Sequence, residues 1–420
     1  MLVRIKNLIA DYPRQFWMLF LGMLISATGG GMVWPFLTIY IRQKLEIPLT
    51  TVTLLVTLNA GMAILSMFLA GPIADHFGRK WLMFFSMLVS CFTFLAMSQA
   101  NTLILWAILI LFNGVFNPLF RVGSDAMVAD LVSEDKRSEA YALLLTSNNV
   151  GIAIGPAIGG FIAAASYTIA FLSAAGLNFL FACLIFFTMV ETLPMRVLTT
   201  QHISTRGSLR YIVHDKPFLS FIPIYAIGII PASIMMVLLP VYAKENFGII
   251  ESQYGFILAA NALMVVLFQY IVTLYIKRFP IYHMLALGTL FYGIGAGSVA
   301  LGHTFIAFLI SMVILTIGEL ILAPTGTTLT ANLAPVDMRG RYMGIFGLTL
   351  GISSAIGPVM GGILNDRVAP VAIWYGALFA GLLATVGFII LSVIRNEPTT
   401  MPGKIDGLHP ITNDEQDVTR

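Results

Sequence analysis

The sequence predicts an all-α membrane protein with twelve transmembrane helices, arranged as two pseudo-symmetric bundles of six. Three observations support this prediction: the composition, the number of apolar segments and an internal repeat. Of 420 residues, 58% are hydrophobic and only 10% are charged, whereas a soluble domain carries about 25% charged residues. Because so few polar side chains could not cover a surface in water, the surface must face lipid.

Twelve segments are apolar and long enough to cross a bilayer, since a spanning helix needs about 20 mostly apolar residues. The predicted spans are 16–41, 52–74, 81–99, 103–130, 141–164, 168–190, 217–243, 254–276, 283–301, 304–332, 342–364 and 369–394. An N-terminal bundle (1–190) and a C-terminal bundle (217–394) are joined by a central cytoplasmic loop, 191–216. The polar segment 395–420 is expected to be a disordered cytoplasmic tail.

The distribution of basic residues predicts the orientation. If the N-terminus is cytoplasmic, only Arg42, Lys44, Lys244 and Arg367 fall in connections on the outer side, and the other basic connections fall inside. Short cytoplasmic connections are enriched in Lys and Arg, and an even number of spans then places both termini in the cytoplasm. We therefore expect a multi-pass protein of the inner (cytoplasmic) membrane, with no cleavable signal peptide and no nucleic-acid partner.

The two halves of the sequence are related by an offset of 202 residues. The segment Ile154-Gly155-Pro156 returns as Ile356-Gly357-Pro358. The pair Asn59-Ala60 returns as Asn261-Ala262. Two parallel repeats of six spans place a substrate site between the halves, near the middle of the membrane.

The connection after the second span contains the sequence GPIADHFGRK, from Gly71 to Lys80. Gly71 permits close helix contact, and Asp75 can accept hydrogen bonds at a helix N-terminus. Gly78 turns the chain, and the basic pair that begins with Arg79 holds the connection in the cytoplasm. A tight basic loop that only sets the orientation is the simpler interpretation.

This segment closely resembles the loop motif of the major facilitator superfamily, with His76 in place of the usual Arg. In the fifth predicted span, Gly155, Pro156 and Gly159 resemble the antiporter motif of the drug-efflux branch of that superfamily. The glycines allow close helix approach and the proline removes a backbone donor. The resemblance implies the major facilitator fold and a role of both motifs in the conformational switch. Ordinary helix packing is the alternative for the second motif.

Three charged residues lie in or near the end of the fourth predicted span: Arg121, Asp125 and Asp130. Arg121 and Asp125 are four residues apart, so they lie on one helix face and can pair. The basic residue partly resembles a further motif of the superfamily. These residues are candidates for proton coupling, and a structural ion pair is the alternative for Arg121 and Asp125.

Glu319 lies about halfway along the tenth predicted span. A charged side chain at that depth costs about 2.5–3.5 kcal/mol on insertion scales. Together with Asp130, this region resembles the LmrP-like multidrug/proton antiporters, and the resemblance implies that such carboxylates couple protons and recognise cationic drugs. The repeat places Asn117 at the position of Glu319, so the carboxylate is specific to one half. A protonated residue bonded to a neighbouring Ser or Thr is the alternative.

Other polar side chains in apolar spans could line a substrate cavity or bond a neighbouring helix. With Glu319, they are the substrate-binding candidates: Asn117, Asn148, Asn149, Asn261, Gln269 and Tyr225.

The sequence therefore predicts a monomeric secondary active transporter that works by alternating access and exports amphipathic or cationic drug-like compounds in exchange for protons. Glu319 is expected to exchange a proton for the substrate, Asp130 to take part in proton release or the switch, and Asp75 and Arg79 to steady the closed cytoplasmic side. A transporter of a sugar, metabolite or lipid is one alternative, and a non-transporting sensor is another. No nucleotide-binding loop or metal-ligand cluster is evident, so no enzyme activity, cofactor or metal is expected.

Overall fold

The computed structural model describes residues 11–193, 212, 214–335 and 338–395. Twelve helices in this part of the chain are long and apolar enough to cross a membrane, which confirms the predicted fold class. Their bounds are α2 Arg14–Leu45, α3 Leu49–Phe77, α4 Arg79–Gln99, α5 Leu103–Leu131, α6 Glu134–Ala165, α7 Tyr167–Thr188, α9 Lys216–Phe247, α10 Glu251–Ile276, α11 Ile281–Ser298 (continued by the 3₁₀ turn Val299–Leu301), α12 Phe305–Leu333, α13 Arg339–Arg367 and α14 Ala372–Ile394. Most of the central loop and the tail predicted at 395–420 lie outside the described residues.

Several helices are longer than the apolar segments that predicted them. α6 begins at Glu134, whereas the apolar span was predicted from residue 141. The added segment, 134–140, contains charged residues, and a helix can continue into water once its backbone hydrogen bonds are established. α9 continues through Pro223, Pro231 and Pro240.

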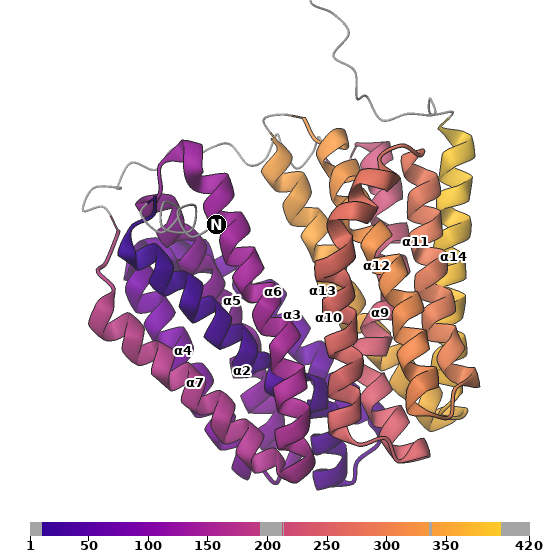
Figure 1. The fold of residues 1–420 in the computed structure, drawn as a ribbon, viewed down its shortest axis with the longest axis horizontal. Helices are drawn as coiled ribbons and strands as arrows, with labels where there is room; N and C mark the ends of the chain where they lie inside the picture. Colours follow the sequence, from indigo (N-terminus) through magenta and orange to yellow (C-terminus); the bar gives the residue numbers. More distant parts are fainter. Residues whose placement is uncertain (1–10, 194–211, 213, 336–337, 396–420) are drawn as a thin grey trace, which may run out of the picture.

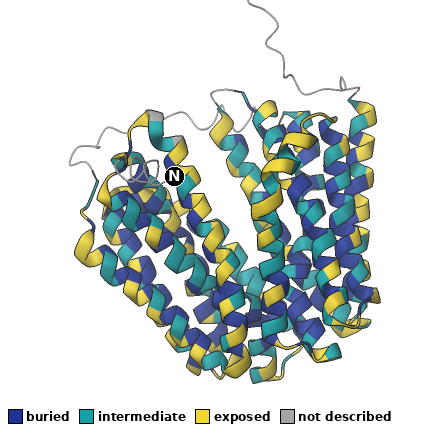
Figure 2. Ribbon diagram, viewed as in Figure 1, coloured by how far each residue is buried: buried dark blue, intermediate teal, exposed yellow. Residues whose placement is uncertain are grey.

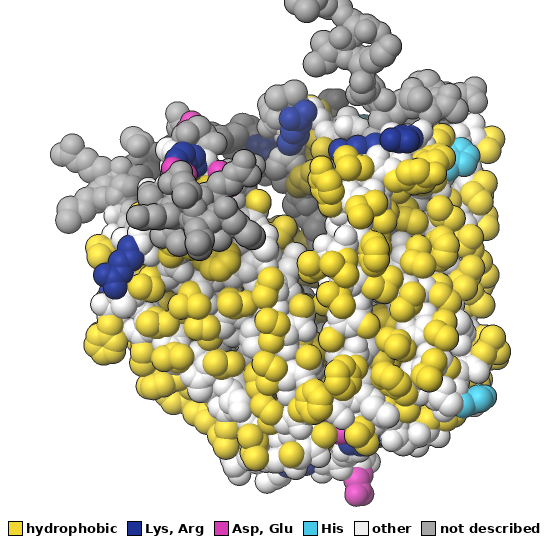
Figure 3. Space-filling view, viewed as in Figure 1, with side chains coloured by type: hydrophobic (Ala, Val, Ile, Leu, Met, Phe, Trp, Pro, Cys, Tyr) yellow, Lys and Arg dark blue, Asp and Glu magenta, His cyan; other side chains and the backbone are white. Residues whose placement is uncertain are grey.

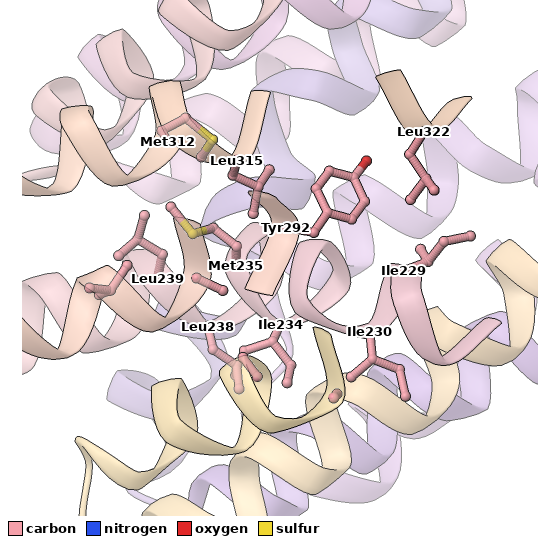
Figure 4. Close-up of a cluster of buried hydrophobic side chains, with 14 of the residues drawn as sticks. Ile229, Ile230, Ile234, Met235, Leu238, Leu239, Tyr292, Met312, Leu315 and Leu322 are labelled. Atoms are coloured by element: carbon pink, nitrogen blue, oxygen red, sulfur yellow. The ribbon is translucent and has the colours of Figure 1, made fainter. Parts of the chain in front are cut away.

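Buried residues are found within each half and where the two halves meet. Helices α2 to α7 form one half and α9 to α14 the other (Figure 1), and buried residues occur along the helices of both (Figure 2). The buried apolar cluster of the C-terminal half also includes residues of the N-terminal half, such as Phe36 and Leu49. In the C-terminal half, Met235 of α9 lies toward Leu315 of α12, and both side chains are fully buried (Figure 4). Since lipid is as apolar as these side chains, close packing rather than water exclusion holds such helices together.

The outer surface is apolar between the two ends of the molecule. Hydrophobic side chains cover the visible face, and Lys and Arg side chains lie mainly toward one end (Figure 3). We call this the terminal end, because α2 begins there and α14 ends there; the opposite end is the distal end. The apolar band fits a chain that crosses a membrane many times.

Three helix pairs make most of the contacts between the two halves: α2 with α9, α3 with α13, and α6 with α10. They diverge toward the terminal end (Figure 1). Contacts between them lie toward the distal end, where the Thr57 hydroxyl donates to the Ala355 carbonyl at 2.6 Å and the Thr38 hydroxyl to the Val237 carbonyl at 3.1 Å. The structure is therefore a conformation that is closed at the distal end.

Candidate functional site

A cavity of about 570 Å³ lies between the halves. Its polar lining comes from both halves and consists of Ser26, Asn117, Arg121, Asn148, Asn261 and Glu319. Its larger apolar side chains are Met23, Trp34, Phe120, Ile152, Met236 and Leu258. The volume falls within the range of drug-sized ligand sites, and an apolar wall with a few polar groups is the usual composition of such sites.

Glu319 contributes a carboxylate to this cavity from the middle of α12. The Asn261 amide of α10 donates to Glu319 Oε2 at 2.9 Å and to Thr316 Oγ1 at the same distance. The Thr316 hydroxyl donates to the Met312 carbonyl at 2.7 Å instead of to the carboxylate. In the described residues, no group of three or more His, Cys, Asp or Glu could hold a metal ion.

The N-terminal half contributes Arg121 and Asn117, both from α5, and Asn148 from α6. Asn117 and Arg121 are one helical turn apart and therefore share a face. Within the described residues, Arg121 makes no hydrogen bond or ion pair. Asp125 is close enough to interact with it electrostatically but does not line the cavity.

Three of the polar candidates from the sequence do not line this cavity. The Gln269 amide donates to Thr273 Oγ1 and to the Leu320 carbonyl, both at 3.1 Å, and so joins α10 to α12. Tyr225 is buried and packs over Gly326 of α12. Asn149 is exposed outside the cavity lining, next to Asn148, which faces the cavity.

A cluster of charged groups joins α3, α4 and α5 at the terminal end. Arg79 lies 3.1 Å from Asp75 and 3.1 Å from Asp130. The Thr192 hydroxyl donates to Asp130 at 2.9 Å. The side chain of Asp75 is 72% exposed, whereas that of Arg79 is only 11% exposed, so Arg79 is the centre of the cluster.

Glu191 completes this cluster, and the sequence did not single it out. Its carboxylate accepts hydrogen bonds from the backbone N–H groups of Arg79 at 2.9 Å and Lys80 at 3.1 Å, at the N-terminus of α4. Gly78 has a φ of +90°, and a side chain there would also collide with Glu191. The only signal in the sequence is that Glu191 directly follows a predicted span.

The glycines of the two motifs differ in their surroundings. A Cβ on Gly155 would lie 2.7 Å from the Thr28 carbonyl oxygen, and one on Gly159 would lie 2.5 Å from Met32 Cα. These glycines allow α6 to pack tightly against α2, and Pro156 of the same motif lines the cavity. Gly71, which was predicted to permit close helix contact, instead has open space around it in this conformation.

An ion pair and several hydrogen bonds join the halves at the distal end, and none of them was predicted from the sequence. Arg42 Nε lies 2.5 Å from Glu245 Oε1. Asp366 accepts hydrogen bonds from the backbone N–H and the hydroxyl of Thr50, both at 2.7 Å. The sequence contained one signal for these contacts: acidic residues lie near those ends of the predicted spans that face the outer side.

A second group at the distal end is more deeply buried. Glu251 of α10 pairs with Lys244 of α9 and accepts a hydrogen bond from the Tyr167 hydroxyl of α7. Lys244 Nζ also donates to the Tyr167 oxygen at 3.3 Å. Because Tyr167 belongs to the N-terminal half and the other two to the C-terminal half, this group ties the halves together.

Comparisons with known proteins agree with this architecture. A family model described as Major Facilitator Superfamily matches residues 19–249 and 221–412. A Na(+), Li(+), K(+)/H(+) antiporter of Planococcus maritimus is 27% identical over 401 residues, covering 88% of this chain and 92% of that protein. Multidrug resistance protein MdtH of Salmonella arizonae is 27% identical over 326 residues, covering 76% of this chain and 79% of that protein.

Solved structures show the same fold at lower identity. The nucleoside transporter NupG (D323A mutant) aligns with a TM-score of 0.77 at 12% identity, covering 90% of this chain and 99% of that one. A POT family transporter in complex with 5-aminolevulinic acid aligns with a TM-score of 0.74 at 19% identity, covering 91% and 96%.

Proposed function

Because this chain belongs to the Major Facilitator Superfamily, we propose that it is a secondary active transporter that exports amphipathic or cationic compounds in exchange for protons. The single observation that carries the proposal is the position of Glu319 in the cavity between the two halves. An ionised carboxylate there attracts a cation, and a protonated one does not. Proton and cationic substrate therefore compete for one group, and this competition is the physical basis of exchange.

The charge distribution supports an inward-facing cavity. The terminal end carries most Lys and Arg side chains of the visible face (Figure 3), so it corresponds to the cytoplasmic side by the positive-inside rule. The halves diverge toward that end. A substrate in the cytoplasm or the inner leaflet could then reach Glu319, and a proton on Glu319 could leave in the same direction.

The cluster around Arg79 is proposed to act in the switch between conformations. Asp130 and Asp75 each pair with Arg79 at the end where the halves diverge. Closing that end brings α3 toward α13, since these two helices already pack together closer to the distal end. Uptake of a proton by Asp130 would weaken its ion pair with Arg79, and release of that proton would restore the pair, so both steps would be coupled to this movement.

The names of two relatives support the proposal and raise a second candidate function. One is described as a multidrug resistance protein and one as a Na(+), Li(+), K(+)/H(+) antiporter, so a monovalent metal ion is an alternative cargo. The cavity favours the organic cation. Asn261 presents its N–H group, not its oxygen, to Glu319, whereas a metal ion needs several oxygen ligands. The side chains of Trp34 and Phe120 suit an apolar substrate.

The test uses purified protein in proteoliposomes with an imposed pH difference. We expect uphill transport of a cationic dye that is accompanied by counterflow of protons, and loss of uphill transport in Glu319→Gln. The matched control is Glu134→Gln, which makes the same change at a side chain that is 89% exposed. Uphill transport of the dye by Glu319→Gln at the normal rate would refute the proposal. Proton counterflow with Na⁺ or K⁺ but with no dye would instead support the metal-ion alternative.

A further inference from the structure

The central cavity contains a basic side chain that proton exchange at Glu319 does not use. Arg121 and Glu319 line the same cavity from opposite halves. Glu319 has the Asn261 amide as a partner, but Arg121 has no hydrogen-bond or ion-pair partner among the described residues. A guanidinium group in a membrane-embedded site normally pairs with an acid or a carbonyl oxygen. Arg121 is therefore available to an anionic group from outside the protein.

The surroundings of Arg121 also suit an anion. Asn117 lies one turn away on the same face of α5, and Asn148 of α6 lines the same cavity. Amide and guanidinium N–H groups are hydrogen-bond donors that a carboxylate or phosphate can accept. The only nearby acid on this helix that interacts with Arg121 is Asp125, and it does not line the cavity. The N-terminal wall is thus rich in donors, whereas the C-terminal wall carries the carboxylate.

A purely cationic compound would leave Arg121 without a partner of opposite charge. Bound at Glu319, it would neutralise one wall and meet a like charge, Arg121, on the other wall. Charges in a cavity with apolar walls are screened less than charges in water. A compound with a cationic group at one end and an anionic group at the other would satisfy both walls. Its body would contact apolar side chains such as Trp34, Phe120 and Met236.

We propose that the substrates of this cavity are dipolar amphiphiles, in which a cationic group binds Glu319 and a carboxylate or phosphate group binds Arg121. The inference rests on the proposed function, since it uses the same cavity and the same carboxylate. It adds a specificity-determining residue, Arg121, and a chemical class of substrate. Arg121 acts here on the substrate's anionic group, stays protonated throughout and does not exchange a proton.

The test is equilibrium binding of two dyes that differ in one charge. Rhodamine B has a free carboxylate and is a zwitterion, and its ethyl ester is a monocation of nearly the same shape. Binding is measured by fluorescence polarisation to the full-length protein in nanodiscs, without a pH gradient. We expect Arg121→Gln to weaken binding of rhodamine B by about tenfold or more, because it removes a charged hydrogen-bond donor. Binding of the ester should stay the same or become tighter.

Two further variants make the result specific. Arg121→Lys keeps the charge and should restore most of the binding of rhodamine B. Arg278→Gln removes an exposed basic side chain outside the cavity and should leave both dyes unaffected. Equal weakening of both dyes by Arg121→Gln, no weakening of either, or no binding of rhodamine B to the unmodified protein would each overturn the inference. Failure of proton coupling would appear only in the Glu319 transport assay, so the two failures are distinguishable.

Discussion

The Asn261 amide and the Glu319 carboxylate join α10 to α12 inside the cavity, with Nδ2 of Asn261 2.9 Å from Oε2 of Glu319. The same amide reaches Thr316, so one side chain holds two groups of α12 in place. α10 also packs against α6 of the other half. We therefore expect a movement of the halves to act through α10 on Glu319, the proton-binding group proposed here.

Asn261→Ala is expected to lower uphill export of a cationic dye about tenfold, because loss of a partner of a buried polar group costs about 1–3 kcal/mol. Initial rates of export from proteoliposomes measure this effect. Asn101→Ala, in an exposed connection, is the matched control. Unchanged export in Asn261→Ala would show that this hydrogen bond does not position Glu319.

Glu251→Gln is expected to open the distal end. The amide can still bond the Tyr167 hydroxyl, but the charge that pairs with Lys244 is lost. The Glu251–Lys244 pair is partly buried. We therefore expect the free-energy cost of losing it to lie between that of an exposed pair, about 0–1 kcal/mol, and that of a fully buried pair, about 3–5 kcal/mol. Spin labels at Gln43→Cys and Val368→Cys, in a background without Cys91 and Cys183, should report a longer distance.

The control for this measurement is Glu46→Gln, an exposed residue at the same end of the molecule. The labelled distance should not change in the control. An unchanged distance in Glu251→Gln as well would mean that the contacts of Arg42 and Asp366 are sufficient to hold the distal end closed.

Gly160→Ala is expected to separate the halves where α6 meets α10. An added Cβ would lie 2.6 Å from the Glu251 carbonyl oxygen, and backbone atoms cannot move aside as a flexible side chain can. Transport should slow, and the labelled distal distance should lengthen. Gly176→Ala has open space for its Cβ and should behave as the unmodified protein does. Normal transport in Gly160→Ala would show that the distal contact tolerates a wider spacing.

Asp130→Asn is expected to slow turnover more than Asp75→Asn does. Both carboxylates lie 3.1 Å from Arg79, but the side chain of Asp75 is 72% exposed and that of Asp130 is 22% exposed. An exposed pair contributes at most about 1 kcal/mol. In both variants we expect a lower maximal rate with little change in the substrate concentration at half-maximal rate. Initial rates over a range of dye concentrations give both quantities. A lower maximal rate in Asp75→Asn than in Asp130→Asn would contradict the prediction.

Much of the fold can be predicted from hydropathy, but which polar residues line the cavity cannot. Asn148 and Asn149 are adjacent in the sequence and equally polar, yet only Asn148 lines the cavity. Gln269 and Asn261 both belong to α10, yet Gln269 bonds α12 outside the cavity lining. Helix periodicity shows which residues share a face. It does not show which face meets the cavity, because lipid and protein interior are both apolar here.

The sequence by itself determined the twelve spans, the repeat that relates the halves, and the presence of a carboxylate at the middle of one span. These follow because a bilayer imposes a fixed length and excludes unpaired charge. Only the tertiary structure decided that Arg121 and Glu319 share one cavity and that Glu251 and Tyr167 join the halves at the distal end. Such contacts depend on how distant helices pack, and no local pattern in a chain encodes the partner of a side chain on another helix.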